Sequence, residues 1–328
     1  MGRQSNSPEW LVLPPLPLLH DDDVIEQQPD QSLLTERYVQ EAIDFIRTDS
    51  PKPFFLYLAH MYVHLPIYVK QEFLDKSENG SYGAAVESID WATSVIMNEL
   101  HSLGLDENTI VIFTSDNGSL GNVHPPFGDR KELIGGSNQP LRGAKGTTWE
   151  GGQRVPAIVR WKGKIEAGRV CDELLTAMDF YPTLANLCGA KVPKDRIIDG
   201  IDAQAVWFDA QAKSQHEHFV YYRANGLEAI RDRQYKLHFG RGNQDVFELY
   251  DIAHDVSETV NVYDRYPEVV ASLTKAANNY RQTLGDDRTG SVGTQVRPIG
   301  RVENPRPLTE FDSRHPYVIA EYDLPDRG

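Results

Sequence analysis

The sequence is poor in cysteine and has no long apolar run. Its 328 residues include two cysteines, Cys171 and Cys188, which could pair but which stand outside any Cys-x-x-Cys motif. No stretch approaches the roughly 20 apolar residues of a membrane helix, and prolines interrupt the apolar run at 11–19. We therefore expect no membrane span, and the run does not have the pattern of a signal peptide.

Positive charge is also scarce. Asp and Glu outnumber Lys and Arg by 48 to 33, which gives a formal net charge of −15 at pH 7, and Lys and Arg never occur more than two in a row. Binding to nucleic acid through its phosphates is therefore not expected. The chain does have 40% hydrophobic and 10% aromatic residues, enough to fill the core of one large or two ordinary globular domains.

The spacing of apolar residues predicts helices that alternate with apolar strands in the first part of the chain. The predicted helices are 35–47 and 82–103, and the predicted strands are 53–59, 109–114 and 155–161. Short segments that are almost entirely apolar are typical of strands that are buried on both faces. The alternation indicates an α/β sheet covered by helices.

The pattern changes near residue 205. Four short strands are predicted at 219–222, 227–231, 235–239 and 246–250, and a last helix at 267–284. Together they indicate a small antiparallel domain. We therefore divide the chain into an irregular segment at 1–30, an α/β domain at 31–204, an antiparallel domain at 205–285 and a polar tail at 286–328.

Asp116-Asn117-Gly118 follows directly on the predicted strand 109–114. Ligands bind at the carboxyl ends of strands in open α/β sheets, and neighbouring carboxylate and amide oxygens are donors that calcium or magnesium prefers. The same three residues are also typical of a simple turn. The motif alone leaves both interpretations open.

Two further residue types could carry chemistry. His60 and His64 lie just beyond the predicted strand 53–59, where a histidine can act as acid or base, although either could also be an ordinary loop residue. Lys145 lies among small residues that let an anion approach the backbone. The segment lacks the spacing of a phosphate-binding P-loop, and by itself Lys145 could be a solvated surface charge.

Two other motifs receive less weight. The acidic cluster Asp21–Asp23 follows no clear strand, and neighbouring carboxylates repel one another, so we assign it no role. Asn79-Gly80-Ser81 matches a glycosylation acceptor, which would matter only in a protein secreted from a eukaryotic cell.

Three segments, taken in order, resemble the signatures of the formylglycine-dependent sulfatases, and most of all the arylsulfatases. They are Phe54–Leu58 with His64-Leu65-Pro66, Asn108–Gly118, and Gly143–Gly152. Two more segments resemble structural parts of the same family, Asp179–Leu184 and Leu249–Asp251 with Asp255, Glu258 and Asn261. Together the segments cover roughly residues 30 to 285.

The resemblance implies a fold and a chemistry. The fold would be an alkaline-phosphatase-like α/β sheet, incomplete at its N-terminus, followed by a smaller antiparallel α+β domain. Asp116 and Asn117 would bind one calcium ion, while His64 and Lys145 would hold sulfate oxygens and stabilise or protonate the leaving oxygen. The expected substrate is an aryl or carbohydrate sulfate ester, and the expected location of the full-length protein is periplasmic, secreted or lysosomal. The oligomeric state is not indicated.

The sequence departs from the family at the nucleophile. Members oxidise the cysteine, or in some the serine, of a Cys/Ser-x-Pro-x-Arg motif to formylglycine, and neither Cys171 nor Cys188 nor any serine has that context. We therefore expect that Met1 falls inside a sulfatase domain, that the remaining calcium ligands lie upstream of it, and that the isolated chain is inactive. Two alternatives stay open: a catalytically dead protein that binds sulfated glycans, and a phosphate or phosphonate ester hydrolase of the same superfamily.

Overall fold

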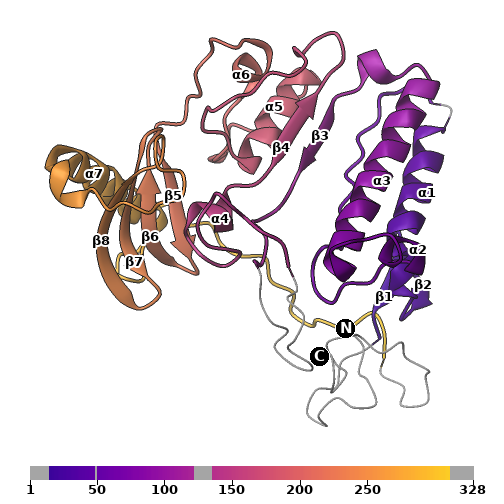
Figure 1. Ribbon diagram of the computed structural model, residues 1–328, viewed down its shortest axis with the longest axis horizontal. Coiled ribbons are helices and arrows are strands. Elements are labelled where there is room, and N and C mark those ends of the chain that lie inside the picture. Colours follow the sequence, from indigo (N-terminus) through magenta and orange to yellow (C-terminus); the bar gives the residue numbers. More distant parts are fainter. Residues whose placement is uncertain (1–14, 49, 122–134, 311–328) are drawn as a thin grey trace. The chain divides into compact units, whose positions relative to one another are not determined.

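The computed structural model describes residues 15–48, 50–121 and 135–310, which form two compact units. The first unit comprises the described residues of Met1–Asp106, Gly121–Gly136 and Gly300–Gly328, and the second those of Glu107–Leu120 and Ser137–Ile299. Figure 1 labels the elements of both.

The first unit begins with a short hairpin where the sequence pattern indicated irregular structure. Strands β1 (Pro17–His20) and β2 (Asp23–Gln27) pair antiparallel, with His20 opposite Asp23. The acidic cluster supplies the tip of this hairpin, and Asp21 takes a positive φ of 52° there, a conformation that Asp tolerates better than most residues. The hairpin escaped prediction because four- and five-residue strands show little periodicity.

Two long helices form the body of the first unit, as the sequence predicts. Helix α1 (Leu34–Ile46) follows the 3-10 turn η1 (Gln31–Leu33) and packs against α3 (Gly80–Ser102) through a core of Val39, Ile43 and Ala92. The short helix α2 (Gln71–Leu74) also contacts α3. The chain leaves α3 at Gly104, whose φ of 68° favours glycine.

The predicted strand at 53–59 is wrong, because this segment has no regular secondary structure. Phe55 and Tyr57 are 75% and 81% exposed, whereas the prediction had both faces of the strand buried. A strand is defined by hydrogen bonds to a neighbouring strand, and no described residue pairs with this segment. Its apolar composition alone could not reveal that.

The turn η2 (Asp106–Asn108) spans the boundary between the units, and the second unit begins with a two-stranded sheet. Strand β3 (Val111–Thr114) pairs antiparallel with β4 (Ala157–Arg160). Both strands lie where the sequence predicts them, but they are not buried on both faces: Phe113 is 38% and Ile158 is 62% exposed. Short helical elements follow, α4 (Glu150–Gln153) before β4, and η3 (Ala177–Asp179), α5 (Phe180–Leu187) and α6 (Gln204–Phe208) after it.

The C-terminal part of the second unit is a four-stranded antiparallel sheet, which confirms the prediction for this region. The strands β5 (Phe219–Arg223), β6 (Gly226–Arg231), β7 (Tyr235–Arg241) and β8 (Gln244–Asp251) pair in sequence order. The turn η4 (Tyr263–Arg265) leads into α7 (Pro267–Leu284), which covers one face of the sheet (Figure 1). The core between them contains Leu227, Ile230, Leu237, Leu249, Leu273 and Ala277.

Three other expectations can be compared with the structure. Cys171 and Cys188 are both free and exposed, so they do not pair. The described part of the predicted polar tail contains no helix or strand, only turns, bends and an isolated bridge between Asp286 and Ser291. Within the described residues, no helix combines the length and the apolar character that crossing a membrane requires.

Candidate active site

Asp116 and Asn117 lie in the loop that leaves β3. The loop is tied locally, because the Asn117 N–H donates to Asp116 Oδ1 at 2.8 Å and Ser115 Oγ donates to the Asn117 carbonyl at 2.9 Å. Asp116 is exposed, and neither its second carboxylate oxygen nor the Asn117 side-chain oxygen accepts a hydrogen bond from a described residue. Two oxygen donors therefore remain available to a cation or to solvent.

Lys145 lies in a second loop that contacts the first one. Its backbone N–H donates to the carbonyl of Ser119 at 2.9 Å, and the Gly118 N–H donates to the carbonyl of Gly152 at 3.1 Å. The approach requires glycine, since a Cβ on Gly118 would lie 1.7 Å from the carbonyl oxygen of Gly151. The two loops thus meet backbone to backbone.

The Lys145 side chain is half-buried and forms no ion pair with any described carboxylate. A half-buried ammonium without a counter-ion is partly removed from water and gains most from binding an anion. The structure therefore brings together the two loops that carry Lys145 and the pair Asp116 and Asn117.

His64 belongs to the first unit, so its place in a common site with Lys145 stays a prediction. Its loop is held by the cluster of Tyr62, Ile67 and Ala85, the last of which lies on α3. His64 Nδ1 lies 2.6 Å from the carbonyl oxygen of Leu65. Because a carbonyl only accepts, Nδ1 carries a hydrogen, and Nε2 is the nitrogen that can gain or lose a proton.

His60 is also partly buried, and its Nδ1 has no hydrogen-bond partner among the described residues. Burial lowers the pKa of this histidine. The ring is therefore neutral at physiological pH, and it offers no cation to an anionic ligand.

The described residues hold no group of three or more His, Cys, Asp or Glu side chains that could bind a metal ion. Asp116 and Asn117 supply oxygen atoms of the type that a hard cation prefers, but calcium takes six to eight oxygen ligands. The oxygen atoms of Asp116 and Asn117 are therefore of the right type for calcium, but two ligands are too few to complete a calcium site.

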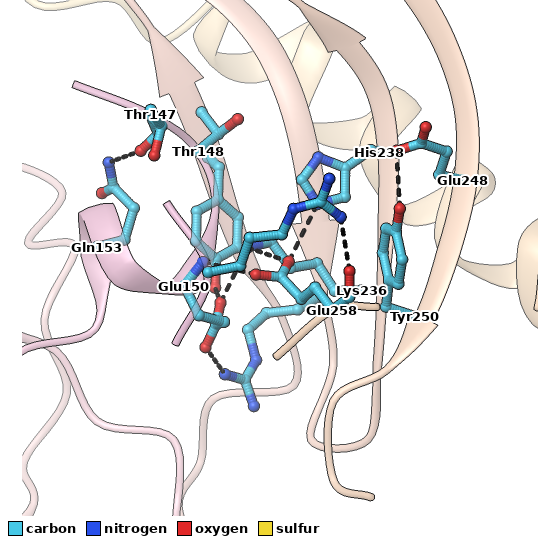
Figure 2. A network of polar contacts seen from close by, with 12 residues as sticks. Thr147, Thr148, Glu150, Gln153, Lys236, His238, Glu248, Tyr250 and Glu258 are labelled. Atoms are coloured by element: carbon cyan, nitrogen blue, oxygen red, sulfur yellow. Dashed lines mark hydrogen bonds and ion pairs between the residues drawn. The ribbon is translucent and has the colours of Figure 1, made fainter. Parts of the chain in front are cut away.

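A buried network of charged residues includes Glu150, which follows the Lys145 loop, and residues of the C-terminal sheet (Figure 2). Sequence reasoning missed most of this network. Glu150, Lys236, His238 and Glu258 are each at most 1% exposed and are joined by hydrogen bonds and ion pairs. Only the family resemblance indicates Glu150 and Glu258 from the sequence. Lys236 carried no signal, because a lysine in a strand is ordinarily taken as a residue of the solvated face.

Comparisons with known proteins agree with the segments that carry the resemblance. The family model "Sulfatase" matches residues 6–190, and the model "N-sulphoglucosamine sulphohydrolase, C-terminal" matches residues 144–283. The second match begins at the Lys145 loop and extends through the four-stranded sheet.

Curated relatives and a solved structure point the same way. The chain is 41% identical to rat (Rattus norvegicus) steryl-sulfatase over 213 residues, 65% of this chain and 36% of that one. It is 41% identical to mouse (Mus musculus) N-acetylgalactosamine-6-sulfatase over 221 residues, 67% of this chain and 41% of that one. The crystal structure of PsFucS1 sulfatase from Pseudoalteromonas sp. matches with a TM-score of 0.70 and 28% identity, over 78% of this chain and 54% of that one.

These matches confirm the predicted alkaline-phosphatase-like fold, with an antiparallel sheet region toward the C-terminus. The chain spans between about a third and a half of the length of the curated relatives it matches.

Proposed function

The chain belongs to the sulfatase family, since the family model covers more than half of its residues, and we propose that it carries part of the active site of a sulfuric ester hydrolase. The observation that supports this most directly is the backbone contact between the loop of Lys145 and the loop of Asp116 and Asn117. The loop with a half-buried lysine that forms no ion pair with a described residue contacts the loop with open oxygen donors for a cation. This is the arrangement that a sulfate group and a charge-neutralising metal ion require.

Lys145 is proposed to bind the sulfate. Its ammonium offers three donors to the sulfuryl oxygens and offsets their negative charge. The half-buried position strengthens this attraction relative to a fully solvated lysine.

His64 is proposed to protonate the leaving oxygen. Its Nδ1–H is held by the Leu65 carbonyl, so the ring presents Nε2 in a fixed orientation. A proton on Nε2 would pass to the ester oxygen as the S–O bond breaks, which avoids the release of a basic alkoxide.

Calcium is proposed as the metal, with Asp116 and Asn117 as two of its ligands. A bound divalent cation supplies positive charge that polarises the sulfuryl group. Asp116 and Asn117 contribute the hard oxygen donors, and their shared loop places both side by side.

The substrate class is proposed to be a carbohydrate or aryl sulfate ester. The names of two relatives, steryl-sulfatase and N-acetylgalactosamine-6-sulfatase, span both a non-sugar and a sugar substrate. By family membership, the full-length protein is proposed to act outside the cytosol, in a periplasmic, secreted or lysosomal setting.

These 328 residues contain no Cys/Ser-x-Pro-x-Arg motif, so we propose that this chain alone binds sulfate esters but does not hydrolyse them. The test is a titration of the chain with 4-nitrophenyl sulfate in the presence of calcium, followed by backbone NMR shifts and by release of 4-nitrophenol. We expect shifts at Gly118 and Lys145, a loss of affinity of about tenfold or more in Lys145→Ala, and no release of nitrophenol.

Lys191→Ala, which removes an exposed lysine of the same unit, is the matched control and should bind as the unchanged chain does. Equal affinity of Lys145→Ala and the unchanged chain would overturn the proposed role of Lys145. Tighter binding of 4-nitrophenyl phosphate with zinc than of the sulfate with calcium would favour the phosphate hydrolase instead.

A further inference from the structure

Three consecutive side chains of the Lys145 loop turn into the C-terminal sheet. Thr148 Oγ1 donates to Glu228 Oε2 on β6 at 2.7 Å, and this pair is buried. The Trp149 ring contacts His238 and Tyr250, with ring centroids 4.6 and 5.6 Å away. Glu150 is the third, and it is the centre of the network in Figure 2.

The Glu150 carboxylate is fully engaged. Its Oε1 accepts hydrogen bonds from the Tyr221 hydroxyl at 2.6 Å and from Lys236 Nζ at 3.0 Å, and its Oε2 accepts from Arg231 Nη1 at 2.9 Å. These three partners come from β5, β7 and β6 respectively. Glu150, the first residue of α4, is therefore bound to three strands of the sheet.

Glu258 is the second carboxylate of the network. Its Oε2 accepts the backbone N–H of Glu150 at 2.8 Å, while its Oε1 pairs with Lys236 Nζ at 3.0 Å and with His238 Nε2 at 3.2 Å. The Glu258 backbone is strained, with a φ of 51° in a residue that has no exposed surface. Strain of this kind persists where the surroundings hold a residue in one conformation, often near a functional site.

Short backbone connections link this network to the candidate site. The Glu258 carbonyl accepts from Arg142 Nη1 at 2.7 Å, and the Arg142 carbonyl accepts the Gly151 N–H at 2.7 Å. The next residue, Gly152, accepts the N–H of Gly118 beside Asn117. Through these bonds the network holds Gly151 and Gly152, and Gly152 in turn contacts the Asp116–Asn117 loop at Gly118.

We propose that Glu258 and Lys236 are positioning residues for the candidate site, which hold the Lys145 loop and, through Gly152, the Asp116–Asn117 loop in the arrangement that binds the sulfate ester. This inference rests on the proposed function and adds to it a task for the C-terminal sheet. Apolar residues of the same volume would supply comparable stability in such an interior, whereas paired charges also fix direction and distance.

The test compares two changes that each neutralise a fully buried carboxylate in the same unit, Glu258→Gln and Asp286→Asn. Asp286 accepts hydrogen bonds from Leu227 and Arg288 and pairs with Arg281, and it makes no contact with the Lys145 loop. Hydrogen exchange of the whole chain is followed by mass spectrometry in peptides that cover 115–120, 142–153 and the strands β5 to β8. Affinity for 4-nitrophenyl sulfate is measured alongside.

We expect Glu258→Gln to raise exchange in the two loop peptides by at least about tenfold while the strand peptides stay within about twofold, and Asp286→Asn to leave the loops unchanged. Equal effects of both variants on the loops, or a uniform rise across the unit, would reduce Glu258 to a stabilising role and overturn the proposal. If Glu258→Gln does not fold, Glu258→Asp gives the same comparison, because it keeps the negative charge but withdraws the carboxylate from the Glu150 N–H and from Lys236.

The two measurements separate the inference from the proposed function. Faster exchange in the loops together with weaker binding of the sulfate supports both. If Glu258→Gln raises exchange in the loops but the unchanged chain binds no sulfate ester, the loop-holding role stands and the proposed function is overturned.

Discussion

The Asn138 side chain pairs with the backbone of Ser119 as a neighbouring strand would. Its Oδ1 accepts the Ser119 N–H at 2.8 Å, and its Nδ2 donates to the Ser119 carbonyl at 2.9 Å. The same Nδ2 also donates to the carbonyl of Gly143 at 3.1 Å. One amide group therefore joins the loop after β3 to the loop that carries Lys145.

Asn138→Ala should loosen this junction. The change removes three hydrogen bonds, each with a net contribution of about 0.5–1.5 kcal/mol, so we expect the free energy of unfolding to fall by about 1.5–4.5 kcal/mol. Urea denaturation measures the fall, and exchange of the Ser119 amide reports the local effect. Asn186→Ala, which loses one exposed hydrogen bond to Asp202, is the control and should cost about 1 kcal/mol or less. An unchanged Ser119 amide in Asn138→Ala would contradict the joining role.

Lys236→Met should destabilise the second unit strongly. Lys236 has no exposed surface and lies 3.0 Å from a carboxylate oxygen of both Glu150 and Glu258. Removal of the cation leaves these buried charges less compensated, which typically costs about 3–5 kcal/mol of unfolding free energy in urea denaturation. Lys213→Met, at an ion pair in which the lysine is 69% exposed, should cost about 1 kcal/mol or less.

A second change makes the Lys236 prediction specific. Adding Glu150→Gln and Glu258→Gln to Lys236→Met removes the uncompensated charges, so part of the lost stability should return. If the triple variant is no more stable than Lys236→Met, the loss comes from packing and not from buried charge.

Glu150 should give the protein an acid-sensitive component of stability. Burial by itself would raise the pKa of this carboxyl, but Lys236 and Arg231 lower it to about 2. A carboxyl with a lower pKa in the folded chain adds stability above its unfolded pKa, and this stability is lost as the pH falls toward the folded pKa. We expect a loss on the order of 3 kcal/mol between about pH 5 and pH 2 from this group.

Urea denaturation at a series of pH values checks this in the unchanged chain and in Glu150→Gln. The variant should lack this part of the pH dependence, and Glu268→Gln serves as the control for loss of an exposed carboxylate. The same acid slope in Glu150→Gln and in the unchanged chain would show that other groups account for it.

Calcium should bind this chain weakly and through Asp116. Two protein ligands leave most of the coordination to water, so we expect a dissociation constant on the order of 1 mM or higher. A calcium titration followed by NMR should shift the amides of Asn117 and Gly118, and Asp116→Asn should abolish these shifts. Asp172→Asn, at another exposed carboxylate, should keep them. Shifts that survive in Asp116→Asn would remove the proposed metal ligand.

The sequence by itself determined the family, the helices α1, α3 and α7, and the order of strands β5 to β8. These features follow from local periodicity, from helix-ending glycines and from motifs that are contiguous in the chain. The same signals pointed to Asp116, Asn117 and Lys145, whose loops the structure brings together.

Only the tertiary structure decided which apolar segments become strands and which polar residues are buried. Segment 53–59 has the composition of a strand but no strand partner among the described residues, and pairing depends on neighbours that are remote in sequence. Lys236 is fully buried because Glu150, from α4 before the sheet, and Glu258, from the segment after it, supply its counter-charges. Burial of a charge depends on partners that only folding brings together, so the residues next to Lys236 in the sequence could not predict its burial.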